Sequence, residues 1–415
     1  MRNRVVITGI GVCSPAGGNA VELWHNLLAG RSGIGPVTLF DTSTMPVRIG
    51  GEAKGFDPVR FAHDFPEVVH ETDRKIRLGL TAASQAIRDS LLDRDALHAA
   101  WFFTGVSLEF FPLDHAGLAA DADDLIESLA GKPGVGLQTP LDRLAQIMGE
   151  HYGFSGGQIT NGSACAAGAQ VVGEAFRRLR AGQGEVAVAG AADSVLNPLG
   201  LGGFSLLRIL STENDRPQEA CRPFDATRQG TVLGEGAAFL VMETLQHAQT
   251  RGARIYAEVL GYGTSLDAYR ATDPEPGGKG AVRSMRRALA DALLQPDDVD
   301  AINAHGTGTP KNDIAETRAI KEALGARAHA IPVTANKSMT GHLIAASGAL
   351  EAAVSAMTLQ TGWMPPTIHL DHPDPLCDLD FVTGGKRVFE GEIVLSNSFG
   401  FGGQNASLVF GKYHD

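Results

Sequence analysis

Short apolar runs alternate with longer segments whose apolar residues recur at helical spacing along most of the chain. The runs predict strands at residues 5–12, 101–106, 186–191, 231–243, 255–261, 299–304, 331–335 and 392–396. The longer segments predict helices at residues 22–28, 72–92, 141–152, 281–294 and 310–324. Strands that alternate with helices imply an α/β fold with a mostly parallel sheet covered by helices on both faces.

Residues 158–182 (QITNGSACAAGAQVVGEAFRRLRAG) contain the most informative pattern in the first half of the chain. They predict a short strand, a tight turn of small residues around Cys165, and a buried helix in which Glu174 is the first charge. A thiol at a helix N-terminus tends towards thiolate, which suits a nucleophile. The alternative interpretation is a small core residue, because free cysteines are often buried.

The second half repeats this pattern. Residues 331–335, 336–341 and 342–362 predict a strand, a small-residue turn and a buried helix whose one charge over most of its length is Glu351. We therefore predict two similar halves, residues 1–252 and 253–415, with their two turns facing each other.

Two stretches of the second half carry histidines at places where function is common. In residues 303–313 (NAHGTGTPKND), His305 follows a predicted strand and precedes a helix. Residues 334–351 place Lys337 and His342 at the mouth of an otherwise apolar helix, where packing alone does not explain them. A glycine loop between two strands follows at residues 396–405, and it predicts close backbone approach to a substrate.

Composition narrows the function classes. A chain of 415 residues with 43% hydrophobic and 20% charged residues is typical of soluble globular proteins, and its net charge of −12 argues against general nucleic-acid binding. No apolar run approaches the ~20 residues of a membrane span, and the start does not resemble a signal peptide. Four scattered cysteines argue against disulfides and a metal site, and they fit the cytoplasm. Gly9-x-Gly11 lacks the third glycine of a dinucleotide loop.

Four motifs in order give the chain a family resemblance. ACAAG contains Cys165, AHGTGTP contains His305, NKSMTGH contains Lys337 and His342, and NSFGFGGQN follows near the C-terminus. Together they resemble the β-ketoacyl-acyl-carrier-protein synthases, most of all the synthase II type of condensing enzyme (ketosynthase) in the thiolase superfamily. The likeness runs from residue 5 to residue 410. It implies a thiolase fold, in which two similar βαβαβαββ halves form a five-layered α-β-α-β-α core.

The resemblance also implies a mechanism. Cys165 is expected to accept an acyl group from the phosphopantetheine of an acyl carrier protein, and His305 and His342 to stabilise the enolate formed from a malonyl unit. Lys337, with Glu316 as its partner, is expected to orient His342. The backbone N–H groups of Cys165 and Phe399 are expected to form an oxyanion hole, with Phe399 gating substrate entry.

The periphery of the site follows from the same resemblance. Thr307 and Thr309 are expected to contact the pantetheine, and Arg74, Lys75 and Arg208 to meet the acidic carrier protein, although the basic cluster could equally be a solvated face. Since substrates arrive on the carrier, no cofactor and no metal are expected. The family also implies a homodimer, or a heterodimer with a second ketosynthase-like chain.

Two departures bear on specificity. Ser163 stands where the family usually has threonine, which retains a hydroxyl group. Residues 104–134 lack the expected glycine-rich run and are acidic, with Phe110 and Phe111 where the acyl pocket would begin. This predicts an acyl chain other than the ordinary long saturated type and a specialised polyketide or polyene pathway. The alternative is a diverged surface loop.

Two other functions fit the sequence less well. A non-catalytic chain-length-factor-like subunit of a ketosynthase heterodimer would lack the nucleophile, whereas Cys165, both histidines and Lys337 are present here. A thiolase acting on coenzyme A would pair its nucleophile with a second cysteine and one histidine, which does not match this chain.

Overall fold

The computed structural model describes residues 2–54, 56–108 and 140–414. Its main feature is an eleven-stranded sheet of mixed direction. Across the sheet the strands are β12 (Asp380–Phe381), β10 (Pro332–Thr334), β9 (Ala301–Asn303), β14 (Ile393–Gly400), β15 (Gln404–Gly411), β8 (Ala257–Leu266), β1 (Val5–Cys13), β7 (Glu235–Thr244), β6 (Val186–Ser194), β4 (Trp101–Gly105) and β5 (Gly157–Asn161).

The sheet is less parallel than the pattern predicted. Pairings from β6 to β14 across the centre are antiparallel, and those toward both ends are parallel. The physical reason is visible at β14 and β15, which are joined by the three-residue turn η7 (Phe401–Gly403). So short a connection can join antiparallel strands but not parallel ones.

The two halves of the sheet have the same strand order. The N-terminal half reads β5-β4-β6-β7-β1 and the C-terminal half reads β10-β9-β14-β15-β8, and β1 pairs antiparallel with β8 where they meet. Two central helices, α7 (Ala167–Arg180) and α13 (Ser347–Thr361), are each preceded by a single 3₁₀ turn, η2 (Ala164–Ala166) and η6 (Ile344–Ala346). The predicted boundary near residue 252 falls between α9 (Leu245–Thr250) and β8.

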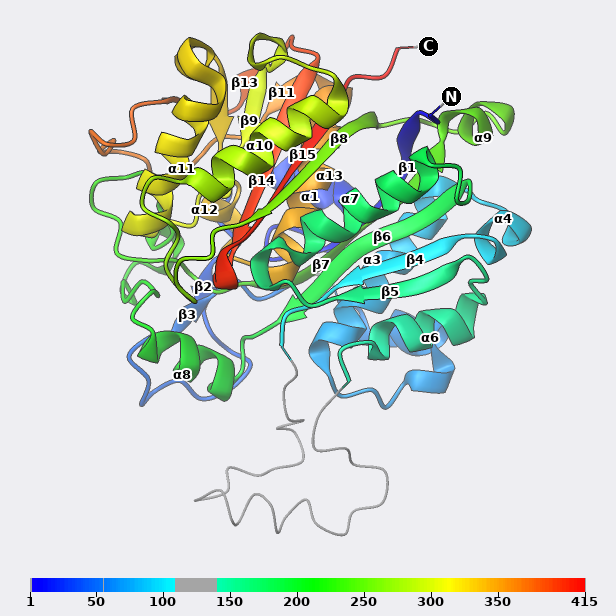
Figure 1. Cartoon of the computed structure of the whole chain (residues 1–415). Coiled ribbons are helices and arrows are strands. Elements are labelled where there is room, and N and C mark those ends of the chain that lie inside the picture. The colour runs from blue at the N-terminus through cyan, green and yellow to red at the C-terminus, as the bar shows by residue number, and fades with distance from the viewer. Residues whose placement is uncertain (1, 55, 109–139, 415) are drawn as a thin grey trace.

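Helices and sheet form five layers, as the thiolase fold requires (Figure 1). Helix α3 (Arg74–Ser90) packs on β1, β6 and β7, and α10 (Lys279–Ala292) packs on β8 and β15 with α11 (Pro310–Leu324) beside it. Helices α7 and α13 contact each other in the middle layer.

The two central helices meet at a pair of glycines. A Cβ atom at Gly168 would lie 2.5 Å from the carbonyl oxygen of Ala345, and one at Gly348 would lie 2.6 Å from the backbone nitrogen of Ala169. No side chain fits at such distances, so glycine at both positions allows the backbones to touch. This contact brings the two small-residue turns together.

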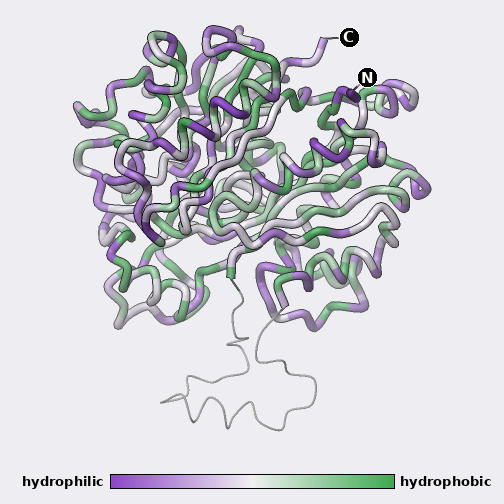
Figure 2. The backbone as a smooth tube through the Cα atoms, viewed as in Figure 1, coloured by the Kyte–Doolittle hydropathy of each residue, from purple (hydrophilic) through white to green (hydrophobic). Residues whose placement is uncertain are grey.

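Burial follows the predicted pattern. Every residue of α13 from Ser347 to Leu359 is buried, and hydrophilic residues gather on outer helices and loops (Figure 2). No described helix is both long and apolar enough to cross a membrane. The remaining helices and short strands are α1 (Ala20–Leu28), α2 (Pro58–Asp64), α4 (Arg94–His98), α6 (Arg143–Tyr152), α8 (Pro198–Leu206), α12 (Lys337–Thr340), β2 (Gly35–Pro36), β3 (Ile49–Gly50), β11 (Trp363–Met364) and β13 (Arg387–Val388).

Candidate active site

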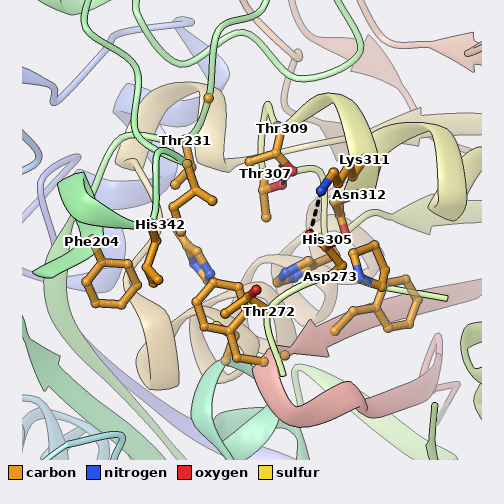
Figure 3. Close-up of a pocket in the computed structure, with 18 of the residues that line it drawn as sticks. Phe204, Thr231, Thr272, Asp273, His305, Thr307, Thr309, Lys311, Asn312 and His342 are labelled. Carbon is orange, nitrogen blue, oxygen red and sulfur yellow. Dashed lines mark hydrogen bonds and ion pairs between the residues drawn. The ribbon is translucent and has the colours of Figure 1, made fainter. Parts of the chain in front are cut away.

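A cavity of about 480 Å³ lies where the two turns meet, and residues of both halves line it (Figure 3). The predicted site residues on its wall are Cys165, His305, Thr307, Thr309, His342 and Phe399. Figure 3 shows His305, Thr307 and Thr309, from the loop before α11, and His342, from the second turn, around the same space. Residues that lie far apart in the sequence are therefore brought together around Cys165.

Cys165 sits at the sharp bend between β5 and α7. The bend requires Ala164 to adopt a left-handed conformation with φ 48°, and the sulfur side chain is 95% buried. Burial raises the pKa of the Cys165 thiol to about 11, whereas the backbone N–H of Phe401 and the charge of Lys337 act in the opposite direction. Burial therefore opposes the predicted tendency towards thiolate in the resting site.

Lys337 is buried and uses all three of its ammonium protons. It contacts the Glu351 carboxylate, lies 2.6 Å from the carbonyl oxygen of His305, and lies 3.2 Å from Nδ1 of the same histidine. An ammonium group can only donate, so Nδ1 of His305 accepts and the imidazole proton lies on Nε2. The structure therefore corrects two expectations: the partner of Lys337 is Glu351, and the histidine it orients is His305.

Glu316 has a different place from the one predicted. Its two carboxylate oxygens accept the backbone N–H groups of His305 and Gly306, each at 2.8 Å. Burial raises the pKa of Glu316 to about 7, while these two N–H groups oppose the shift. Because it faces the backbone, Glu316 fixes the loop that carries His305 and does not pair with Lys337.

His342 lies across the cavity from His305. Their rings are edge to face with centroids 5.3 Å apart. Burial and the charge of Lys337 lower the pKa of both imidazoles well below the ordinary value, so both are neutral at physiological pH. Nδ1 of His342 lies 3.0 Å from Oγ of Ser347, the first residue of α13. Sequence reasoning singled out neither Ser347 nor the role of Glu351.

The backbone group that acts on the Cys165 thiol lies two residues further along the chain than predicted. The backbone N–H of Phe401, and to a smaller extent that of Cys165 itself, lowers the pKa of the thiol against the larger effect of burial. Phe399 contributes its ring to the cavity wall, 5.8 Å from the ring of His305. Phe401 rather than Phe399 therefore has the backbone position next to the thiol, since β14 carries Phe399 as a paired strand residue and η7 starts at Phe401.

The loop around Phe401 depends on two glycines in the left-handed conformation. Gly402 and Gly403 adopt φ values of 75° and 76°, which side-chain-bearing residues rarely do. The Phe401 ring stacks on Phe204 of α8 at a centroid distance of 6.2 Å, and Gly402 N–H donates to the carbonyl of Ala271. These contacts hold the loop over the cavity.

The family follows from the sequence comparisons. Residues 2–248 match the family described as "Beta-ketoacyl synthase, N-terminal domain", and residues 256–371 match "Beta-ketoacyl synthase, C-terminal domain". The chain belongs to the β-ketoacyl synthase family. A relative named 3-oxoacyl-[acyl-carrier-protein] synthase 2, from Synechocystis sp., is 41% identical and is aligned over 99% of both chains.

Solved β-ketoacyl synthase structures agree with this assignment. The ishigamide ketosynthase/chain length factor superposes with a TM-score of 0.88 at 34% identity and covers 100% of both chains. A second structure, of a type II polyketide synthase acyl-carrier protein in complex with its ketosynthase bound to the hexaketide, gives a TM-score of 0.85 at 30% identity and also covers 100% of both chains. The thiolase fold of the β-ketoacyl synthases is therefore the fold of this chain.

Two of the three residues expected to dock a carrier protein are committed elsewhere. Lys75 is 2% exposed, and its Nζ lies 3.0 Å from the carbonyl oxygen of Leu108 and 3.4 Å from Asp73. Arg74 pairs with the buried carboxylate of Glu235. Lys75 is therefore buried away from any docking surface, whereas Arg74 keeps a third of its side chain exposed and its docking role stays a prediction.

The other predicted residues at the edge of the site are Arg208, Thr307 and Thr309. Arg208 is exposed and lines the cavity mouth. Thr307 and Thr309 line the cavity with their hydroxyl oxygens 2.9 Å apart. Among the described ranges no cluster of histidine, cysteine and acidic side chains could hold a metal ion. Phe110, Phe111 and the rest of the predicted specificity segment beyond residue 108 lie outside the described residues.

Proposed function

We propose that this chain catalyses the decarboxylative Claisen condensation of an acyl group held on Cys165 with malonyl-acyl-carrier protein, giving 3-oxoacyl-carrier protein. One observation carries the proposal: Cys165 and two neutral histidines, His305 and His342, line one cavity. The name of the Synechocystis relative supports the same chemistry.

The first step is acyl transfer. The Cys165 sulfur attacks the thioester carbonyl of an acyl-carrier protein, a C–S bond to Cys165 forms, and the C–S bond to the pantetheine breaks. The departing pantetheine sulfur receives the proton that the Cys165 thiol loses, so no net proton is consumed. The N–H groups of Cys165 and Phe401 stabilise the tetrahedral oxyanion.

The second step needs donors for an enolate. The bond between the α-carbon and the carboxylate of a malonyl thioester breaks, carbon dioxide leaves, and the electron pair forms an enolate. Neutral imidazoles at His305 and His342 can donate Nε2–H to its oxygen. The enolate carbon then attacks the acyl carbonyl on Cys165, the C–S bond breaks, and the departing thiolate takes one proton from solvent, the single proton that the overall reaction consumes.

The partners follow from how the substrates arrive. We propose that an acyl carrier protein delivers both thioesters, that Thr307 and Thr309 contact its pantetheine, and that Arg208 meets its acidic surface. The complex of a ketosynthase with its acyl-carrier protein supports this partner. No cofactor is required. All four cysteines are free, which favours a cytoplasmic site for the reaction.

Assembly and pathway are further proposals. The ishigamide structure pairs a ketosynthase with a chain length factor, and it supports a dimer, either of two copies or with a second ketosynthase-like chain. The ishigamide structure and the polyketide complex, 34% and 30% identical, support a specialised polyketide or polyene pathway. A chain-length-factor-like role for this chain itself has less support, because Cys165 is present and faces the cavity.

A direct assay tests the proposed reaction. Purified protein incubated with acyl-carrier protein and malonyl-carrier protein should release one carbon dioxide for each 3-oxoacyl-carrier protein formed. Mass spectrometry of the carrier protein and trapping of labelled carbon dioxide measure the two products. Acyl transfer to Cys165 without either product would contradict the assignment.

Substitution of the histidines should separate the two steps. We expect His305→Ala and His342→Ala each to slow malonyl decarboxylation by ~10²–10³-fold, the usual effect of removing one oxyanion donor. Labelled acyl groups should still load onto Cys165, because the N–H groups facing the sulfur remain. If neither variant loaded acyl groups, the histidines would act in the first step instead.

A further inference from the structure

We propose that Ser347 is a positioning residue that holds His342 in the tautomer with its proton on Nε2. The inference rests on the proposed function, because it concerns the donor that His342 presents to the enolate. Ser347 makes two hydrogen bonds, one to Nδ1 of His342 and one to the backbone N–H of Leu343.

Ser347 lies behind His342, away from the solvent. Its hydroxyl oxygen lies 3.0 Å from Nδ1 of His342 and accepts the backbone N–H of Leu343, also at 3.0 Å. Ser347 is 2% exposed and His342 is 5% exposed. Water therefore has little access to either partner, and the pair must satisfy its own hydrogen bonds.

The donors and acceptors around Ser347 determine the tautomer of His342. The Leu343 N–H is a fixed donor, so the hydroxyl oxygen accepts there. Among the residues that the structure describes, the hydroxyl proton of Ser347 makes its other hydrogen bond with Nδ1 of His342. If Nδ1 carried a proton, the serine hydroxyl would lose this acceptor while buried, which is unfavourable. The hydroxyl therefore donates to Nδ1, and the single proton of the neutral imidazole lies on Nε2.

The first half of the chain indicates that the turn itself does not need serine. The position equivalent to Ser347 is Ala167, since each residue directly follows the 3₁₀ turn and begins a central helix. Ala164 and Ile344 have nearly the same φ, 48° and 47°, so the bend forms with alanine as well as with serine. The hydroxyl is present in the half that carries His342 and absent from the half that carries Cys165.

Different donors thus fix the same tautomer in the two histidines. The ammonium of Lys337 donates to Nδ1 of His305, and the hydroxyl of Ser347 donates to Nδ1 of His342. Both imidazoles then offer Nε2–H as a donor. The charge of Lys337 already lowers the pKa of both imidazoles. A neutral hydroxyl beside His342 can therefore fix the tautomer without adding a second charge.

Nuclear magnetic resonance of the wild-type protein provides the first test. In protein labelled with ¹⁵N-histidine, we expect the His342 ring, assigned by its loss in His342→Ala, to show an unprotonated Nδ1 and a protonated Nε2. In Ser347→Ala the two ring signals should move toward each other as the tautomers mix. A protonated Nδ1 in the wild type would overturn the proposal whether or not any variant folds.

Kinetics provide the second test. Ser347→Ala should lower kcat for malonyl decarboxylation about 10-fold, less than the ~10²–10³-fold expected when a donor is removed altogether. Acyl loading of Cys165 and KM for the malonyl carrier should change little, and Ser347→Thr, which keeps the hydroxyl, should recover the rate. Full decarboxylation by Ser347→Ala would overturn the positioning role.

Ser90→Ala is the matched control. Ser90 is a buried serine of α3 whose hydroxyl also accepts a backbone N–H, that of Leu92, but it contacts neither histidine. This variant should keep the wild-type tautomer and rate. If the wild type itself failed to decarboxylate malonyl-carrier protein, the proposed function would fail, whereas the tautomer measurement would still decide the role of Ser347.

Discussion

The Cys165→Ala variant is expected to form no 3-oxoacyl product. The acyl group must become covalently attached before the malonyl unit reacts, and Cys165 is the cysteine on the cavity wall. The remaining cysteines, Cys13, Cys221 and Cys377, are buried, and burial raises the pKa of each thiol to between about 11 and about 12. None of them lines the cavity, so none can replace the nucleophile.

The decisive measurement separates chemistry from folding. Incubation with labelled acyl-carrier protein should leave Cys165→Ala unlabelled, while its thermal unfolding midpoint stays close to that of the wild type. Cys165→Gln is the matched control, because its amide imitates an acyl-thioester and should retain malonyl decarboxylation. Condensation by Cys165→Ala would refute the covalent mechanism.

The pattern of apolar residues was sufficient to predict several of the elements that surround the nucleophile. The predicted helix 310–324 coincides with α11, and the small-residue turn around Cys165 is present as η2; in the second half the predicted turn 336–341 holds the short helix α12, and the 3₁₀ turn η6 comes after it at Ile344–Ala346. These features are local: small side chains allow the bend, and a long apolar segment with one charge must be buried. The direction of the central strands is not local, because it depends on which distant strand each one pairs with.

Charge partners were harder to predict than the residues themselves. Glu316 and Glu351 are both buried acids near Lys337, and burial raises the pKa of each to about 7. Glu351 is the one charge in the buried part of α13, which is a signal that it must have a partner. The sequence does not reveal that Glu316 faces two backbone N–H groups, because that depends on how the loop at His305 folds over α11.

The contacts of backbone donors and of basic clusters also could not be predicted from the sequence. NSFGFGG contains two phenylalanines at alternate positions, and only the place where β14 ends decides that Phe401 faces Cys165. Arg74 and Lys75 form a basic pair in sequence, yet α3 turns both toward buried acidic or carbonyl groups. Side-chain direction at a helix start depends on the neighbouring layer, which composition does not encode.

We expect Lys337→Met to lose both activity and stability. Removing the ammonium leaves the Glu351 carboxylate buried without its partner, and breaking a buried ion pair in this way costs about 3–5 kcal/mol. His305 also loses the donor to its Nδ1, so its proton is no longer fixed on Nε2. Malonyl decarboxylation should fall by ~10²-fold or more, as for loss of an oxyanion donor.

The pH dependence of unfolding tests the electrostatic cause. Without the ammonium, burial raises the pKa of Glu351 beyond its value of about 7, while the unfolded chain keeps an ordinary value of ~4.3. The folded variant then binds a proton that the unfolded chain releases. The contribution of protonated Glu351 to the stability of the variant is therefore fully present below pH ~4.3, the pKa in the unfolded chain. This contribution is lost as pH rises through the pKa of Glu351 in the folded variant. Denaturant unfolding should show a larger loss relative to the wild type at pH 8 than at pH 5.

The double variant Lys337→Met/Glu351→Gln separates the two roles of the lysine. Without a buried carboxylate, it should recover much of the stability and lose the pH dependence, since both partners are then uncharged. It should not recover decarboxylation, because methionine cannot donate to Nδ1 of His305. Recovery of both would mean that Lys337 acts on the reaction only by neutralising Glu351. Recovery of neither would mean that the ion pair shapes the cavity beyond its charge.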